Sequence, residues 1–208
     1  MMRKPPPEPL VHSSLGLQTL CHRLRHVTTC DILELGPARS GNIEFWSRFS
    51  PSIYIADLRA SLPLPLAALH SEDAESVAPD WNRILRLPGT NCYDVILAWD
   101  LLNYLELSAV SSLTEYLKRF CRPETVLFSM IFDQKQMPDE ITVYRIADES
   151  HIKYEYAGSE MRVCPRHQPR ALAGVLTRFR VSDSFRLRNG MVEYLFEYQG
   201  DNQDSQAV

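Results

Sequence analysis

Apolar runs alternate with segments of helical periodicity along most of the chain. The near-continuous apolar runs lie at 31–35, 52–56, 93–98 and 125–132. The intervening segments that suit helices lie at 13–27, 41–49, 64–78 and 107–120. Apolar runs of this kind are typical of strands buried on both faces of a parallel sheet. The alternation therefore predicts an α/β domain in which helices cover both faces of the sheet.

The end of the chain has a different pattern. Residues 169–177 suit a helix, and 179–188 and 191–198 read as two strands with Asn189-Gly190 between them. Asn-Gly readily adopts the positive φ angles of a type I′ turn, so this segment predicts a β-hairpin. A parallel sheet that ends in an antiparallel hairpin is a narrow architectural class.

We expect one domain over residues 13–200. The Pro-rich residues 1–12 suit a flexible tail, and the polar residues 201–208 suit a disordered one. Residues 134–168 form an insertion or lid before the last helix. Within it, 141–146 and 152–156 alternate between apolar and polar residues, which indicates a hairpin that covers the sheet or makes a homodimer contact. Its aromatic residues favour a second interpretation, an aromatic-lined acceptor pocket.

Composition narrows the possible partners. The net charge of −4 gives no reason to expect nucleic acid, and no apolar run reaches the roughly 20 residues of a membrane-spanning helix. Five cysteines without a CxxC pair favour reduced thiols and a cytoplasmic protein. His22 and His26 are four residues apart, but Cys21 lies on the opposite, apolar face of the predicted helix. We therefore expect a solvated basic face there and no metal.

The loop after the first apolar run carries a family resemblance. Leu33-Glu34-Leu35-Gly36-Pro37-Ala38-Arg39-Ser40-Gly41-Asn42 resembles the acidic-x-Gly-x-Gly-x-Gly loop of class I S-adenosylmethionine (SAM)-dependent methyltransferases. The resemblance implies a three-layer Rossmann-like fold, with a mostly parallel seven-stranded sheet of order 3-2-1-4-5-7-6 and an antiparallel last strand. It also implies SAM as cofactor, held by Glu34, Gly36, Ala38 and Gly41. Ala38 and Ser40 stand at the second and third glycine positions, and Gly41 compensates if the loop shifts by one residue.

Three further acidic residues match positions of the same family. Asp57 ends the second apolar run, where the resemblance implies a carboxylate that accepts hydrogen bonds from the ribose hydroxyls. Asp80-Trp81 matches the pair that binds adenine, and Asp73 is a competing assignment for that acid. Asp100 lies in the segment 93–105, which is similar to the fourth strand and following turn of the family.

A Rossmann dehydrogenase shares the order strand, glycine turn, helix and acid. Its fingerprint requires G-x-G-x-x-G, whereas this chain has only Gly36 followed by Gly41. The C-terminal Asn-Gly hairpin also suits the methyltransferase sheet better, so the methyltransferase interpretation is preferred.

The resemblance implies in-line methyl transfer to a small-molecule or protein acceptor. Such a displacement depends mainly on positioning, so a catalytic triad is not expected. His167, His151 and Tyr104 are weak candidates for a general base. Asn103-Tyr104 replaces the frequent Glu-His of the family, and two glycines of the loop are lost. An alternative hypothesis is therefore a catalytically degenerate scaffold that acts through protein–protein contacts.

Overall fold

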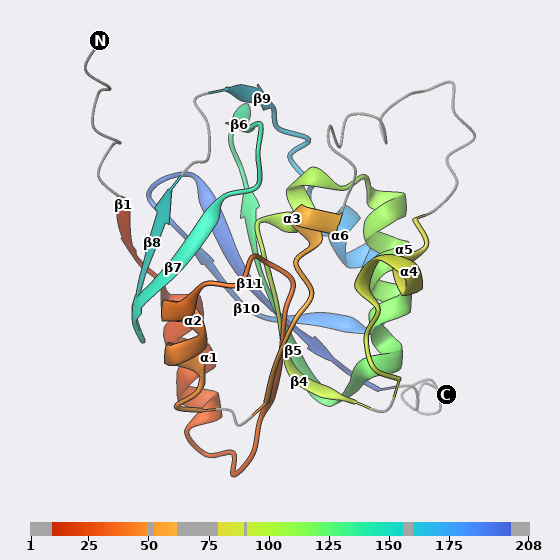
Figure 1. Cartoon of the computed structure of the whole chain (residues 1–208). Coiled ribbons are helices and arrows are strands. Elements are labelled where there is room, and N and C mark those ends of the chain that lie inside the picture. The colour runs from red at the N-terminus through yellow and green to blue at the C-terminus, as the bar shows by residue number, and fades with distance from the viewer. Residues whose placement is uncertain (1–9, 50–51, 62–78, 90, 156–159, 201–208) are drawn as a thin grey trace, which may run out of the picture.

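The computed structural model describes residues 10–49, 52–61, 79–89, 91–155 and 160–200. A six-stranded sheet of order β10-β11-β5-β4-β2-β3 forms its centre (Figure 1). Its strands are β2 (Asp31–Glu34), β3 (Ser52–Ile55), β4 (Tyr93–Trp99), β5 (Cys121–Phe132), β10 (Phe179–Arg186) and β11 (Met191–Tyr198). Every strand of this sheet falls on a segment that the hydrophobic pattern had assigned to a strand.

Helices cover both faces of the sheet. On one side lie α1 (Leu15–Leu24) and α2 (Ser40–Trp46), and on the other α4 (Trp81–Leu85), α5 (Leu107–Leu117) and α6 (Pro169–Val175) (Figure 1). The short helix α3 is Leu58–Ser61, and the 3-10 helices η2 and η3 span Leu101–Tyr104 and Lys118–Phe120. The expected three-layer α/β architecture is confirmed.

Strand directions agree with the predicted change at the end of the chain. β2 pairs in parallel with β3 and β4, and β4 with β5, whereas β11 is antiparallel to both β5 and β10. The predicted hairpin is confirmed, but the turn is not type I′, because Gly190 has φ 79° whereas Asn189 has no positive φ. The predicted seven-strand order also requires one more strand in the part of the chain that connects β3 to β4. The described residues between β3 and β4 contain no such strand. Residues 62–78, and with them the helix expected at 64–78, lie outside the described residues.

Helix α1 lies directly on the sheet at β11. Ser14 caps it, because its Oγ accepts a hydrogen bond from Leu17 N at 3.0 Å. The buried Glu193 of β11 accepts a second one from Gly16 N at 2.8 Å. A Cβ at position 16 would lie 2.9 Å from the Phe128 ring. Glycine therefore allows the close approach of helix and sheet.

The insertion folds as β-structure. β7 (Val143–Asp148) and β8 (His151–Glu155) form the expected hairpin, and β6 (Gln136–Pro138) pairs with β9 (Met161–Val163). Strand β1 (Leu10–Ser13) joins β8 antiparallel and completes a second, three-stranded sheet. The prediction of a flexible tail is therefore wrong for residues 10–12. Figure 1 shows this small sheet beside α2, at the upper end of the central sheet.

Candidate functional site

Three acidic residues lie at the carboxyl ends of neighbouring parallel strands. Glu34 ends β2, Asp57 lies two residues after the end of β3, and Asp100 directly follows β4. The chain runs from β2 to β3 on one side and then crosses to β4 on the other side of β2. Ligands of open α/β sheets bind at such a reversal of strand order. The fold therefore places the candidate site at this edge.

Glu34 is fully enclosed at this edge. Its Oε1 accepts hydrogen bonds from Gly36 N at 2.8 Å and from Trp99 Nε1 at 2.6 Å. Its Oε2 is buried and has no partner within the described part of the chain. Burial raises the pKa of Glu34 to about 8, although the two hydrogen bonds oppose the shift. The side chain is therefore largely protonated at neutral pH.

Asp100 is the second buried acid. Its Oδ2 accepts a hydrogen bond from Thr142 N at 3.1 Å, while Oδ1 is buried and has no partner among the described residues. Burial raises the pKa of this carboxyl group to about 7, and hydrogen bonds from Thr142 and from the Tyr144 side chain partly oppose the shift. Two buried carboxyl groups, each with one unsatisfied oxygen, thus lie at the carboxyl ends of β2 and β4.

Trp99 and Tyr144 fill the space in front of the glycine turn. A Cβ on Gly36 would lie 2.8 Å from Glu34 Oε1 and 3.0 Å from Trp99 Cδ1, so the room left by this glycine is taken by the protein's own indole. The Trp99 ring stacks on Tyr144 with centroids 5.1 Å apart and planes 7° from parallel. The cavity that remains between Gly36, Trp99, Thr142 and Tyr144 measures about 10 Å³. This is room for about one water molecule.

The insertion is fixed in this closed position by Asn42 of α2. Its Nδ2 donates to Tyr144 O at 3.0 Å, and its Oδ1 accepts from Ile146 N at 2.9 Å. Asn42 therefore pairs with β7 as another strand would. Sequence reasoning missed Asn42, Trp99 and Thr142 as site residues and named Tyr144 only as an aromatic of the insertion. Their spacing along the chain carried no signal of this contact.

The two other predicted carboxylates, Asp57 and Asp80, each cap a short helix. Asp57 Oδ1 accepts from Ala60 N at 3.1 Å and caps α3. Asp80 is exposed, and its Oδ1 accepts from Arg83 N at 3.1 Å as the cap of α4. Trp81 is buried and donates through Nε1 to Ser112 Oγ of α5 at 2.9 Å. None of the three lines the cavity between Gly36 and Tyr144. Asp73 lies outside the described residues.

The role of Gly41 in cofactor binding stays a prediction. Ala38 and Gly41 are exposed, and a Cβ on Gly41 would meet no described atom within 4 Å. The close approach occurs at Gly36 instead.

The three candidate bases are engaged elsewhere. Tyr104 donates to Glu140 O at 2.7 Å, and His151 contacts Asp148 across the β7–β8 turn at 2.9 Å. His167 Nε2 lies 3.1 Å from Leu102 O and 3.0 Å from Leu105 O, so this nitrogen carries the proton. Burial lowers the pKa of His167. None of these side chains lines the cavity at Gly36, so their assignment as bases stays a prediction.

These features define an α/β protein with a closed ligand edge at a strand-order reversal. No family model and no curated protein matches the chain. Among solved structures, an S-adenosylmethionine-dependent methyltransferase from Clostridium acetobutylicum aligns over 89% of this chain and 90% of its own. The identity is 12% and the TM-score 0.54. The chain thus has the fold of the class I SAM-dependent methyltransferases.

Two other methyltransferases of known structure align less well. The N-methyltransferase NodS from Bradyrhizobium japonicum matches 88% of this chain and 94% of its own, at 13% identity and a TM-score of 0.46. The 1,6-didemethyltoxoflavin-N1-methyltransferase from Burkholderia thailandensis, solved with S-adenosylhomocysteine, matches 89% and 78%, at 14% identity and a TM-score of 0.46.

The described residues lack two features, a membrane-spanning helix and a cluster of metal ligands. They contain no helix that is long and apolar enough to cross a membrane. They also contain no group of three or more His, Cys, Asp or Glu side chains placed to hold a metal ion.

Whether SAM fits this edge depends on two properties of the edge, its charge and the volume of its cavity. SAM carries an ammonium and a sulfonium group, and the buried carboxyl groups of Glu34 and Asp100 would attract such a cation only in their ionised form, which burial disfavours. The cavity of about 10 Å³ is far below the several hundred Å³ of a cofactor pocket. In this arrangement, therefore, the part of the edge lined by described residues does not hold the methionine end of SAM.

Proposed function

We propose that the protein is a SAM-dependent methyltransferase that acts on a small-molecule acceptor and closes over its cofactor edge with the β7–β8 hairpin. The observation that carries the proposal is the pair of buried carboxyl groups, Glu34 and Asp100, at the carboxyl ends of β2 and β4. Each keeps one buried oxygen without a partner in the described chain. Buried polar atoms without a partner are few in native structures, and a bound ligand, ion or water is one explanation for them.

Access to this edge requires the Trp99–Tyr144 stack to separate. Tyr144 belongs to the hairpin, and Asn42 holds that strand through two hydrogen bonds. Local opening breaks these two hydrogen bonds and the ring stack, and it also strains the hydrogen bonds of Thr142 N to Asp100 and of Tyr104 to Glu140 O. Because the closed state competes with the cofactor, the apparent affinity is reduced by the fraction of open molecules.

Calorimetric titration with SAM and S-adenosylhomocysteine tests this function. Wild-type protein should bind both, and Tyr144→Ala should bind more tightly because it vacates the cavity. Tyr154→Ala is a matched control, since Tyr154 is the cross-strand partner of Tyr144 and does not line the cavity. Absence of binding by wild type and by Tyr144→Ala, with both folded by circular dichroism, would refute the proposal.

The filled cavity favours a second candidate, a non-catalytic scaffold of methyltransferase fold. In this function Trp99 and Tyr144 permanently replace the cofactor, and the insertion presents a surface to a protein partner or to a second copy of the chain. The same titration separates the two. A scaffold binds no cofactor in the wild-type form, whereas the enzyme does.

A further inference from the structure

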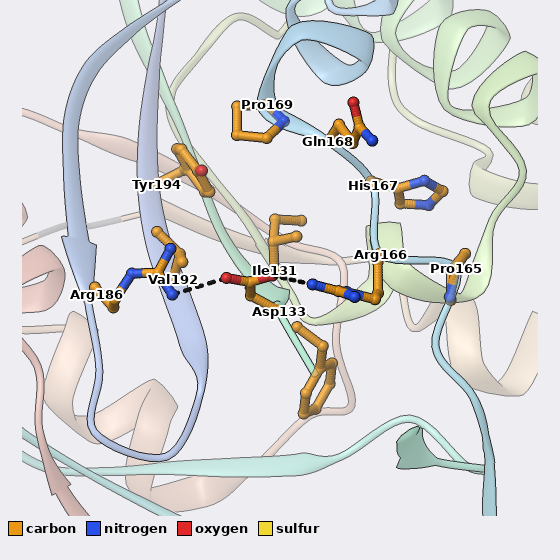
Figure 2. Close-up of a pocket in the computed structure, with 11 residues that line it drawn as sticks. Ile131, Asp133, Pro165, Arg166, His167, Gln168, Pro169, Arg186, Val192 and Tyr194 are labelled. Atoms are coloured by element: carbon orange, nitrogen blue, oxygen red, sulfur yellow. Dashed lines mark hydrogen bonds and ion pairs between the residues drawn. The ribbon is translucent and has the colours of Figure 1, made fainter. Parts of the chain in front are cut away.

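A larger cavity lies at the carboxyl end of β5. Its volume is about 390 Å³, within the usual range for small-molecule sites. The end of β5, the loop 165–169 before α6, and the facing strands β10 and β11 form its walls (Figure 2). It shares no lining residue with the small cavity at Gly36.

Two guanidinium groups converge on one carboxylate in this cavity. Figure 2 shows Arg186 and Arg166 pointing toward Asp133 from opposite sides. The Arg186 Nη1–Asp133 Oδ2 distance is 2.7 Å, and Arg166 Nη2–Asp133 Oδ1 is 3.3 Å. Each guanidinium has five N–H donors and is always charged, so most donors remain available to a ligand. The two positive charges and one negative charge leave an excess of one positive charge.

The loop that presents Arg166 is held rigidly. Arg166 has φ 48°, in the left-handed region that non-glycine residues rarely adopt. Its backbone N donates to Cys164 Sγ at 3.4 Å, and the neighbouring His167 ring bonds the carbonyl oxygens of Leu102 and Leu105. These contacts fix the loop between β9 and α6 against the turn after β4. The guanidinium is thus positioned before a ligand arrives, which reduces the entropy lost on binding.

The remaining wall is largely apolar. Ile131, Val192 and Tyr194 line it, and all three are buried or nearly so. Burial lowers the pKa of His167, so its ring is neutral near pH 7 and adds no further charge. The cavity thus combines a cationic end with an apolar side.

We infer that this cavity, the Arg166–Arg186 site, binds a small molecule that carries a carboxylate or phosphate group on an apolar or aromatic body. Planar guanidinium groups match both anions through paired hydrogen bonds, and the apolar wall accommodates the body. Asp133 orients the two arginines and keeps the site from holding anions without the apolar contact. The inference does not depend on methyl transfer, since the two cavities share no lining residue.

Direct titration of the purified full chain tests the inference, with benzoate and phenyl phosphate as probes and benzamide as the neutral isostere. At least one anion should bind saturably, more weakly at high salt, and benzamide should not bind. Stronger binding of benzoate would show that the site prefers a carboxylate, and stronger binding of phenyl phosphate that it prefers a phosphate. Arg166→Gln and Arg186→Gln should each weaken binding about tenfold or more, as expected for hydrogen bonds between charged groups.

Arg180→Gln is the matched control. It removes the same charge from the same strand at an exposed position that does not line the cavity, and binding should be unchanged. Absence of binding by both anions overturns the inference. So does equal binding by wild type, Arg166→Gln and Arg186→Gln, because the anion then binds elsewhere. Both arginines are more than half exposed, so their variants should fold, and circular dichroism checks this.

Discussion

Protonation of Glu34 should make the stability of the protein depend on pH in an unusual direction. The folded-state pKa is about 8, against an ordinary value of 4.5. Between these two values the folded chain binds one more proton at Glu34 than the unfolded chain. Stability linked to this group is therefore fully present below about pH 4.5 and is lost as the pH rises toward 8. Most proteins gain stability from their carboxylates in the opposite direction.

Glu34→Gln isolates this contribution. The Gln side chain keeps an oxygen for the hydrogen bonds from Gly36 N and Trp99 Nε1 but cannot ionise. Each pH unit inside the window is worth about 1.4 kcal/mol per group. From pH 5.5 to 7.5 the wild type should therefore lose about 2.5 kcal/mol of unfolding free energy relative to the variant. This is a large share of the roughly 5–15 kcal/mol that stabilises a typical domain.

Urea denaturation at pH 5.5, 6.5 and 7.5 measures this difference. Comparison with the variant cancels the contributions of Asp100, Glu193 and the partly buried histidines, which both proteins retain. Glu44→Gln, which removes an exposed carboxyl group from the neighbouring helix, controls for the charge change. Parallel pH profiles for wild type and Glu34→Gln would refute the argument, because they would mean that Glu34 is equally ionised in the folded and unfolded states.

Three other substitutions test separate parts of the structure. Asp57→Ala should lower the free energy of unfolding by about 0.5–2 kcal/mol through loss of the α3 cap. It should also weaken SAM binding about ten- to a hundredfold if Asp57 holds the ribose. Unchanged SAM affinity in calorimetry would mean that Asp57 only caps the helix. Glu193→Ala should cost about 1–3 kcal/mol in urea denaturation, because Gly16 N loses its buried acceptor. Gly41→Val should leave packing unaffected, since its Cβ meets no described atom. A loss of SAM binding in that variant would place the cofactor against Gly41, and equal binding would exclude it.

The predicted secondary structure was accurate where the signal is local. Buried strands such as β4 and β5 appear as continuous apolar runs, the helix predicted at 13–27 contains α1, and Asn189-Gly190 lies in the predicted hairpin. Strand β1 was missed because its pairing with β8 joins segments about 140 residues apart, and no local pattern encodes such a pair. The Pro-rich neighbours of β1 also favoured an extended tail.

The candidate site was less predictable, because the type of a residue does not show which distant residue it contacts in the folded chain. Glu34 and Asp100 lie at the carboxyl edge, and their predicted role in cofactor binding stays a prediction, because their burial depends on the insertion. The capping roles of Asp57 and Asp80 are local, and a carboxylate three residues before a helical N–H is a signal that could have been read from the chain. The contact of Trp99 with Tyr144 has no such signal.

Gly36 shows why a retained glycine does not by itself identify a ligand site. Glycine is required there, because a Cβ would overlap Glu34 Oε1 and approach Trp99 within 3.0 Å. The protein's own indole therefore accounts for the close approach that the family resemblance assigned to the cofactor. Only the contact across the insertion differs between the enzyme and the scaffold: Tyr144 either separates from Trp99 and admits SAM, or keeps the edge closed. The test between the two proposed functions therefore lies in the contacts that hold β7, those of Asn42 and of Thr142 with Asp100, more than in the retained glycine.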